Sequence, residues 1–449
     1  MFNRSPRPLV LLALLFALLL AACGAPQAPT AADPTAAPVA ADPTAAPVAA
    51  APTAAPVAPA VEPVEISYFT FSAAPDHLDS LDKMIAAFEE ANPTIAVKVE
   101  TAPFDQYFTK LQTLIAGGTA PDVFELNYEN FVSYASKGVL ADLSPMAAAE
   151  PGLAERFYPR AYEAFSQGGK QYGLPQSFSN VVLFYNKDLF DAKGVAYPTA
   201  DWTWEDELEA AQKLTDPAAG VWGDYSPVQF WEFYKTAAQS GCSVLSADAS
   251  TVTINEPGCV ESLSWMVDKI NKYKVAPSDA DMAGVSDGDL FKQGKIAMLR
   301  TGIWMFSGFE DAPFKWDIAL EPGNTQKAHH FFANAVAVSA TSKQQEAAWK
   351  WAQFFTSSQT AAQIRVDASW ELPALNDQAL FNAWLEQNPP ASRAVVFEAL
   401  DTLVTPPVIE QQSQMQDAVN KLLEAAKLGT LTPQAALDQA KTEIEALIK

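Results

Sequence analysis

Metal-binding and thiol-bearing side chains are scarce in this sequence. Its 449 residues include 3 cysteines and 3 histidines, too few for a zinc cluster, an iron–sulfur site or repeated thiol chemistry. Basic residues are also few, because 29 Lys and Arg stand against 53 Asp and Glu, and the formal net charge is -24. Such a charge repels phosphate backbones, so we expect no nucleic-acid partner. The chain is 49% hydrophobic, which is enough for more than one packed core.

Residues 1–22 have the pattern of an export signal. Arg4 and Arg7 precede an apolar run over residues 9–20, which is too short to span a bilayer. The small residues before Cys23 resemble the bacterial lipobox, which is cleaved in front of its cysteine and lipidated on the sulfur. We therefore expect a lipoprotein anchored through Cys23 to the extracytoplasmic face of the cell membrane, in a periplasm or at the cell surface. The alternative is a plain signal peptide with an incidental cysteine.

Residues 23–63 have the composition of a spacer. The nine residues 32–40 recur as 41–49, and Pro, Ala, Thr and Val dominate without any aromatic residue. Such a segment cannot bury enough surface to offset the entropy of ordering, so we expect a disordered linker.

Outside the cytoplasm, the remaining pair Cys242 and Cys259 is most simply interpreted as a disulfide.

From Val64 onward, the hydrophobic pattern alternates between strand and helix. Residues 64–68 and 95–99 alternate as strands, and residues 78–88 between them repeat as a helix that Asn92-Pro93 ends. Residues 121–126 read as the next strand. This alternation predicts an α/β fold with largely parallel sheets covered by helices. Thr432 before Pro433 predicts the start of a terminal helix.

Several motifs carry a family resemblance across residues 64–449. They occur in this order: Asn92-Pro93, Ala116-Gly117-Gly118-Thr119-Ala120-Pro121-Asp122-Val123, Tyr172-Gly173-Leu174-Pro175, Tyr185-Asn186-Lys187-Asp188-Leu189-Phe190, Trp202-Thr203-Trp204-Glu205, Phe291-x-Gln293-Gly294-Lys295, Gly302-x-Trp304, and Ala347-Ala348-Trp349-Lys350. Together they resemble the bacterial extracellular solute-binding protein family 1, the sugar-binding lipoproteins of ABC importers that include maltose- and oligosaccharide-binding proteins.

The resemblance implies a fold and a function. The fold is the two-lobed periplasmic-binding-protein fold of type II, in which each lobe is a mainly parallel sheet flanked by helices and the ligand lies in the cleft between lobes. Lobe 1 takes residues 64–175 and about 291–345, and lobe 2 takes residues 176–290 and about 346–449, including the C-terminal helices. The implied function is that of a monomer without cofactor or enzymatic activity, which captures a mono- or oligosaccharide and delivers it to the transmembrane subunits of a permease.

Sugars present apolar C–H faces and hydroxyl edges, so a site for them needs aromatic planes beside uncharged or anionic hydrogen-bonding groups. In the family, the tryptophan after the glycine commonly stacks on sugar, which makes Trp304 behind Gly302 the first candidate. The other candidates occupy strand exits and polar loops: Phe71, Ser72, Glu125, Asn127, Gln176, Ser177, Asn180, Asp224, Trp231, Asn334, Trp370 and Glu371. The alternative for each aromatic residue is core packing, and for each polar residue a solvated loop.

The chain departs from the family at His329-His330, where a paired glycine is frequent. Adjacent histidines in a strand point to opposite faces and cannot readily share one ion, so we expect no metal site. Arginine is scarce in the expected mature chain, which disfavours a phosphorylated or carboxylate cargo.

Two rival functions remain open at this point. A polyamine carrier would suit the acidic charge and the aromatic residues. A secreted glycosidase also uses carboxylates and aromatic rings, but their spacing in the fold cannot be obtained from the sequence.

Overall fold

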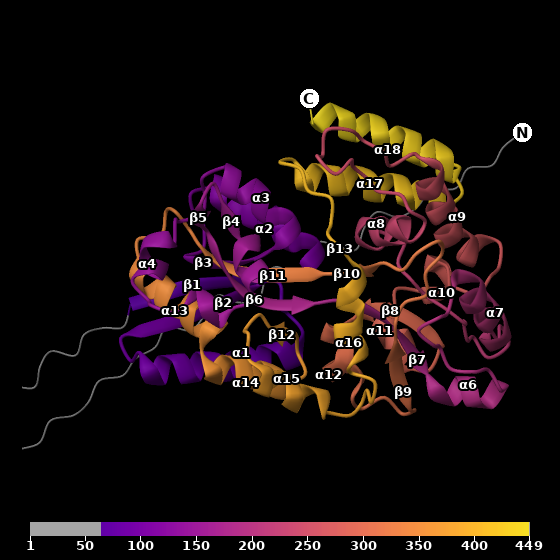
Figure 1. Cartoon of the computed structure of the whole chain (residues 1–449), viewed down its shortest axis with the longest axis horizontal. Helices are drawn as coiled ribbons and strands as arrows, with labels where there is room; N and C mark the ends of the chain where they lie inside the picture. Colours follow the sequence, from indigo (N-terminus) through magenta and orange to yellow (C-terminus); the bar gives the residue numbers. More distant parts are fainter. Residues whose placement is uncertain (1–63, 449) are drawn as a thin grey trace, which may run out of the picture. The chain divides into compact units, whose positions relative to one another are not determined.

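The computed structural model describes residues 64–448, which contain two main β-sheets and their surrounding helices (Figure 1). The predicted signal peptide, the linker and Cys23 lie outside the described residues. Within the described part of the chain, no helix has both the length and the apolar composition needed to cross a membrane.

The larger sheet has six strands, of which four run in one direction. In spatial order they are β12 (Leu372–Pro373), β6 (Gly173–Ser179), β11 (Phe332–Val338), β3 (Val123–Asn127), β1 (Val64–Thr70) and β2 (Ile95–Thr101). β1 is parallel to β2 and β3, whereas β11 is antiparallel to β3 and β6, and β12 is antiparallel to β6. Strands β1, β2, β3 and β6 therefore end at the same edge, where β11 and β12 begin. We call this edge, with the residues that follow or precede the strands there, the binding edge.

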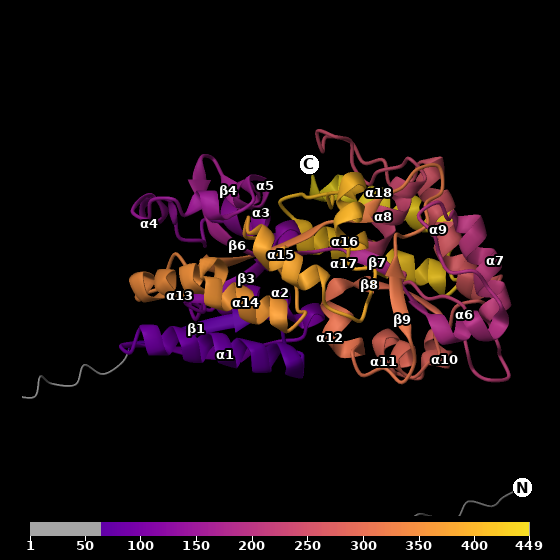
Figure 2. The ribbon, with the colours of Figure 1, turned by 60° about the horizontal axis from the view of Figure 1, so that its bottom comes forward.

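The predicted β-α-β pattern is confirmed at the start of the described chain. Helix α1 (Pro75–Ala91) connects β1 to β2, and α2 (Phe104–Ala116) connects β2 to β3. Asn92 caps α1, because its side-chain amide donates to the Phe88 carbonyl at 3.0 Å. Figures 1 and 2 show that α1 lies beside α14 (Gln359–Asp367), which comes from a distant part of the sequence.

The smaller sheet has three strands, in the order β8 (Met298–Gly302), β7 (Val181–Asn186) and β9 (Trp316–Ala319), and all neighbours are antiparallel. Only Asn180 separates β6 of the larger sheet from β7 of the smaller one. The chain returns to the larger sheet between β9 and β11. It thus passes from one sheet to the other at these two places.

The expectation of mainly parallel sheets is wrong in its detail. Parallel neighbours need a crossover helix between them, and such helices connect only β1, β2 and β3 within these two sheets. β11 arrives from the other sheet without that crossover and pairs antiparallel on both sides. The segment 291–345, expected as a whole in lobe 1, is divided: β8 and β9 lie in the smaller sheet and β11 in the larger one. The segment 346–449, expected as a whole in lobe 2, is divided as well, because its α14 contacts α1 and its β12 pairs with β6 of the larger sheet.

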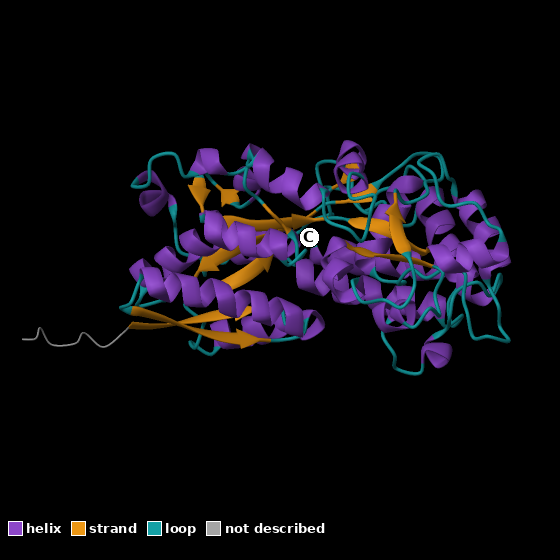
Figure 3. Cartoon of the chain, turned by 90° about the horizontal axis from the view of Figure 1, so that it is seen from below, coloured by secondary structure: helices purple, strands orange, loops and turns teal. Residues whose placement is uncertain are grey.

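Helices flank the strands of both sheets (Figure 3). Those that contact the larger sheet or each other beside it are α1, α3 (Tyr128–Ser136), α5 (Pro159–Ala164), α13 (Gln345–Ser357), α14 and α15 (Gln378–Leu385). Those associated with the smaller sheet and the second core are α6 (Lys187–Lys193), α7 (Trp204–Leu214), α8 (Phe230–Gln239), α9 (Pro257–Asn271), α11 (Asp287–Lys292), α17 (Gln412–Lys427) and α18 (Pro433–Leu447). The short elements are α4 (Ser144–Ala148), α10 (Asp279–Met282), α12 (Phe306–Phe309), α16 (Val395–Glu398), β4 (Ser166–Gln167), β5 (Lys170–Gln171), β10 (His329–His330), β13 (Leu403–Val404) and the 3-10 helices η1 (Ala154–Arg156), η2 (Ile303–Met305) and η3 (Ala399–Thr402).

The terminal helix begins as the sequence predicts. The Thr432 hydroxyl accepts the Ala435 N–H at 3.2 Å, and Pro433 occupies the first helical position. Leu437 and Ile444 are buried on one face of α18 against α9 and α17. These three helices and α8 enclose a second hydrophobic core.

The predicted disulfide between Cys242 and Cys259 is confirmed, with 5.4 Å between the Cα atoms. It joins the loop after α8 to the first turn of α9, and both cysteines are buried at the edge of the second core. A cross-link between residues separated by 17 positions restricts the unfolded chain more than the folded one.

We expect the double variant Cys242→Ser/Cys259→Ser to lose about 3 kcal/mol of unfolding free energy, because the unfolded chain regains the entropy of the open loop. Denaturant unfolding, followed by circular dichroism with and without a reductant, measures this loss. The reductant should lower the midpoint of the wild type and leave the variant unchanged. Equal midpoints for the oxidised wild type and the variant would show that the bridge contributes nothing to stability.

Candidate functional site

Strand register brings several of the predicted ligand-binding residues to the binding edge. Asn334 of β11 pairs with Asn127 of β3 on one side and Ser177 of β6 on the other. Phe71 and Ser72 directly follow β1, and Trp370 and Glu371 directly precede β12. The larger sheet therefore gathers candidates from five of its strands or strand exits.

Glu371 is the centre of a buried hydrogen-bond cluster at this edge. Its carboxylate accepts a short hydrogen bond from the Ser177 hydroxyl and a longer one, at 3.3 Å, from Ser179. The Asn334 amide donates to the same carboxylate at 3.2 and 3.3 Å. Arg365 of α14 lies beneath the cluster, with 3.9 Å between its Nη1 and Glu371 Oε2. Glu371 is thus held by four side chains, and its orientation is fixed.

A second carboxylate, Glu125 of β3, is fully buried beside this cluster. The Thr70 hydroxyl donates to Glu125 at 2.5 Å, and the Gln176 amide donates at 2.9 Å. Burial raises the pKa of the Glu125 carboxyl to about 7, although the hydrogen bond from Thr70 acts in the opposite direction.

The Trp370 ring lies between two side chains. His77 of α1 stacks on it nearly parallel, with 4.5 Å between ring centroids, and the Arg365 guanidinium lies 4.2 Å from its centroid. Trp370 is only 2% exposed, so a sugar reaches the face of this ring only if His77 moves. In this structure the Trp370 ring packs against His77 and Arg365.

Trp304 is half-buried in η2, immediately after β8. Its ring lies over Gly302, where an added Cβ would be 1.9 Å from Trp304 Cζ3. The glycine therefore provides space for the tryptophan. The Ile303 N–H donates to the Asn180 carbonyl at 3.1 Å, which ties this turn to the point where the chain passes between sheets.

Trp304 belongs to an aromatic group that we call the Trp304 group, consisting of Trp231, Trp304, His330 and Phe332. The Phe332 ring lies 6.0 Å from Trp304, 6.3 Å from Trp231 and 5.0 Å from His330 between centroids. Trp231, Trp304 and Phe332 are partly exposed, whereas His330 is fully buried beneath them. His330 Nε2 contacts the Trp231 carbonyl oxygen at 2.5 Å.

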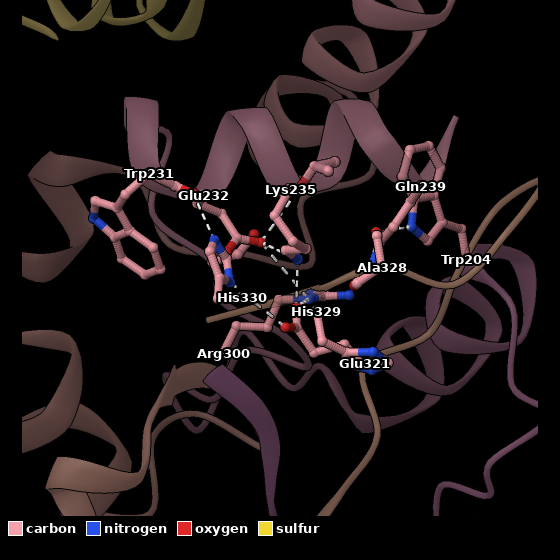
Figure 4. Close-up of polar contacts among 12 residues, drawn as sticks. Trp204, Trp231, Glu232, Lys235, Gln239, Arg300, Glu321, Ala328, His329 and His330 are labelled. Atoms are coloured by element: carbon pink, nitrogen blue, oxygen red, sulfur yellow. Dashed lines mark hydrogen bonds and ion pairs between the residues drawn. The ribbon is translucent and has the colours of Figure 1, made fainter. Parts of the chain in front are cut away.

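Figure 4 shows the buried charges that hold His330. Its ring nitrogens lie 4.0 Å from Glu232 and 3.9 Å from Glu321. Lys235 pairs with both carboxylates, and Arg300 Nε lies 3.2 Å from Glu321. These contacts anchor the underside of the Trp304 group to α8 and β8.

Asp224, one of the predicted ligand-binding residues, is also part of this buried ion network. Lys269 Nζ lies 2.6 Å from its carboxylate, and Arg300 Nη1 lies 3.5 Å away. Burial raises the pKa of Asp224, and Lys269 opposes that shift. Glu207 completes the network by pairing with Arg300 and Lys269. Asp224 is 0% exposed and lies apart from the Glu371 cluster.

Four further candidates have structural partners that account for them. The Asn127 side-chain oxygen caps α3 by accepting the Asn130 N–H at 3.3 Å. The Asn180 amide donates to the Val396 carbonyl at 2.8 Å and is fully buried. Ser72 donates its N–H to the Thr70 hydroxyl at 3.0 Å, and Phe71 packs edge-on against Tyr107. The assignment of the predicted residues to ligand binding stays a prediction.

Sequence reasoning missed three residues that contact the candidates. His77 and Arg365 cover Trp370, and Phe332 connects Trp231 with Trp304. Phe332 stands two positions before Asn334, so strand alternation could have placed it on the same face of the strand. Nothing in the sequence connects His77 with Trp370, because they are distant in the chain. Arg365 is only five residues before Trp370, in the last turn of α14, and its contact with the ring depends on how the chain turns after that helix.

The two histidines of β10 contact different elements. His329 Nδ1 lies 2.7 Å from the Thr402 hydroxyl, while His330 faces Glu232 and Glu321. Over residues 64–448, no three His, Cys, Asp or Glu side chains are grouped so that they could hold a metal ion.

Two cavities, of about 800 and 350 Å³, lie elsewhere. The first is lined by residues of α13 such as Trp349 and Phe354, and the second by Tyr225 and Gln229 with residues of α10 and α17. Neither lining includes a predicted ligand-binding residue.

The two sheets, the two chain crossings and an edge lined with carboxylates, amides, hydroxyls and aromatic rings define an α/β solute-binding protein. The chain belongs to the bacterial extracellular solute-binding protein family, whose characteristic sequence pattern matches residues 74–362. The resemblance noted in the sequence is thereby confirmed. This family binds solutes outside the cytoplasm and is not enzymatic.

Individual relatives agree with this assignment. An ABC substrate-binding protein of Listeria monocytogenes, solved in complex with cycloalternan, is 50% identical, with a TM-score of 0.84 over 86% of this chain and 99% of that chain. A galactooligosaccharide-binding protein of Bacillus subtilis is 24% identical over 81% of this chain and 86% of its own length. A maltose-bound protein of T. maritima, 22% identical over 86% of this chain and 100% of that chain, has the same fold with a TM-score of 0.73. The predicted periplasmic-binding-protein fold is confirmed.

Glu125 makes stability depend on pH. Its folded pKa of about 7 exceeds the ordinary value of 4.5, so between these pH values the folded protein keeps a proton that the unfolded chain has lost. The unfolding free energy should therefore fall as the pH rises from about 4.5 to 7, by up to roughly 3 kcal/mol from this group. Chemical denaturation across that range measures the fall.

The matched variant is Glu125→Gln, which keeps the shape of the side chain and cannot titrate. Its stability should decline less with pH than that of the wild type. Glu129, whose pKa burial also raises to about 7, remains in both proteins as a common background. Parallel stability profiles for the two proteins would contradict the raised pKa of Glu125.

Proposed function

We propose that this protein captures an oligosaccharide at the binding edge and delivers it unaltered to the transmembrane subunits of an ABC importer. The observation that carries this proposal is the 50% identity to the Listeria monocytogenes ABC substrate-binding protein solved with cycloalternan, since it extends over 99% of that chain. The galactooligosaccharide-binding relative of Bacillus subtilis supports the same ligand class.

The chemistry of the binding edge suits such a ligand. The partly exposed rings of Trp304, Trp231 and Phe332 offer planes for the apolar faces of sugar rings. Glu371, Ser177 and Asn334 offer acceptors and donors for hydroxyl groups. The nearby Arg365 is buried under Trp370, so it provides no exposed guanidinium for an anionic cargo.

The proposed division of the body assigns one lobe to each sheet, with the ligand held between them. The passages at Asn180 and between β9 and β11 would act as hinges, because they connect the two sheets directly. Trp304 stands beside the first passage, through the hydrogen bond between Ile303 and Asn180. Closure of the lobes would then bring Trp304 against the ligand on Glu371 and Asn334.

We expect maltotriose, galactooligosaccharide or cycloalternan to raise the melting temperature of the protein, because a ligand that binds only the folded state stabilises it. Spermidine and putrescine are screened alongside and should produce no shift. Chromatography of the recovered sugar should show no cleavage. A shift with the polyamines alone would replace the proposed ligand class with the polyamine alternative.

Titration of the best sugar then examines the role of Trp304. Trp304→Ala should weaken binding by about tenfold or more, since a stacking plane is removed. Trp265→Ala is the matched control, because Trp265 is also partly buried but stacks on Trp204 within the helices. Equal affinities for wild type and Trp304→Ala would remove Trp304 from the site.

We further propose that Cys23 carries a lipid that anchors the protein, since it follows small residues and a short apolar run and precedes the spacer. When expressed in bacteria with labelled palmitate, the wild type should incorporate label and sediment with membranes. Cys23→Ser should do neither, while Gln27→Ser should behave like the wild type. Membrane association of an unlabelled Cys23→Ser protein would contradict the lipid anchor.

A further inference from the structure

A second aromatic group lies at the opposite end of the binding edge from Glu371. Phe104, the first residue of α2, is 50% exposed. Its ring lies edge-on to Phe71 at 5.3 Å and to Phe108 at 5.7 Å between centroids. Phe71 and Phe108 are themselves partly exposed. We call these three residues the Phe104 group.

The Phe104 group belongs to the same edge as the predicted polar residues. Phe71 follows β1 directly, and Thr101, which ends β2, pairs with Thr70. Phe104 comes three residues after β2. The predicted polar residues form a row along the binding edge, from Glu371 beside β12 through Ser177 and Asn334. The Phe104 group lies at the far end of this row.

The spacing of strands sets the length of this row. Neighbouring strands lie about 4.8 Å apart, so β12 and β2, five spacings apart in the sheet, are separated by about 24 Å. β11, which carries Phe332, and β1, which leads to Phe71, are two spacings or about 10 Å apart. A single sugar ring cannot contact both ends of such a row.

The Phe104 group is also held in a fixed position. The Tyr107 hydroxyl, one turn along α2, lies 3.0 Å from the Phe69 carbonyl oxygen and 2.8 Å from the Glu125 carbonyl oxygen. It also accepts the Glu125 N–H at 3.1 Å, and the Tyr107 ring stacks on Phe69 at 4.4 Å. The start of α2 is thereby fixed to the two strands that lead to the polar residues.

Exposure of this group has no structural advantage. An aromatic side chain that is half exposed loses part of the stabilisation that burial would give it. Three neighbouring rings also form a contiguous apolar patch rather than an isolated exposed residue. Leu428, which is 62% exposed at the end of α17, is an exposed apolar side chain in another part of the chain. Rigid aromatic planes next to hydroxyl-binding groups are what the apolar face of a sugar ring requires.

We propose that Phe104, with Phe71 and Phe108, forms a second sugar-stacking subsite, so that the binding edge takes a carbohydrate of at least two rings and discriminates against single sugars. This inference rests on the proposed carbohydrate function. It adds the minimum length of the ligand and the residues that recognise the second sugar ring. One part of the ligand lies at Glu371 and the Trp304 group, and another lies on the Phe104 group.

Calorimetric titration of the full mature chain, with cycloalternan as the multi-ring probe and glucose as the single-ring probe, tests the subsite. The wild type should bind cycloalternan at least tenfold more tightly than glucose. Phe104→Ala should lose about tenfold in affinity for cycloalternan, while its affinity for glucose stays as in the wild type. Leu428→Ala, which removes an exposed apolar side chain elsewhere, should change neither affinity.

Two more variants separate stacking from stability. Phe104→Leu keeps an apolar side chain of similar size without the ring and should lose as much affinity as Phe104→Ala. Phe104→Trp keeps a ring and should restore cycloalternan binding. Thermal unfolding of each variant shows that the fold is retained.

The outcomes also separate this inference from the proposed function. Wild-type affinity for cycloalternan in Phe104→Ala overturns the subsite and leaves carbohydrate binding intact. An equal loss for glucose and cycloalternan also overturns it, because Phe104 would then act on the shared part of the site. A wild type that binds no sugar of the wider panel overturns the proposed function itself.

Discussion

The position of β11 between β3 and β6 is the constraint on which the binding edge depends. This strand arrives from the smaller sheet and pairs antiparallel on both sides, which places Asn334 level with Asn127 and Ser177. Side chains alternate between the faces of a strand, so a shift of one residue would turn Asn334 to the opposite face and separate it from Glu371. Because Phe332 also belongs to β11, the same register determines where the Trp304 group meets the larger sheet.

The polar groups of the site are largely satisfied by one another. Glu371 accepts hydrogen bonds from Ser177, Ser179 and Asn334, and Glu125 accepts them from Thr70 and Gln176. Leaving a buried carboxylate without such donors would cost more free energy than a typical hydrogen bond contributes. These networks therefore fix the carboxylates in place, and in the proposed site a ligand hydroxyl would join an ordered arrangement. In the proposed site, the partly exposed aromatic rings would supply the remaining contact surface, which suits an uncharged ligand.

The sequence predicts local features of this protein better than long-range ones. Residues 64–126 alternate in hydrophobicity as a strand and helix series, and Thr432-Pro433 marks a helix start, because both signals act within a few residues. The mixed sheet was not predictable, since periodicity shows which face of a strand is buried and not which strand lies beside it. Asp224 looked like a residue of a polar turn, yet Lys269 and Arg300 enclose it in a buried ion network. Trp370 looked like an available plane, yet His77 and Arg365 pack against its ring. Lys269, Arg300 and His77 are distant in the sequence from the residues that they contact, and tertiary packing brings them close.

The Gly302-x-Trp304 motif shows how a family pattern can be understood as a steric requirement. Gly302 has a φ of -89°, which any residue can adopt, so its backbone does not demand glycine. Space demands it, because a Cβ at this position would meet three atoms of the Trp304 ring at 1.9 to 2.2 Å. Gly302 also pairs with Val181 at the end of β8. The next residue, Ile303, donates its N–H to the carbonyl of Asn180, where the chain passes between sheets. The tryptophan is therefore fixed to the smaller sheet while its ring contacts Phe332 of the larger one. Any rotation of one sheet against the other must change that contact, which links the proposed stacking surface to the relative position of the two sheets.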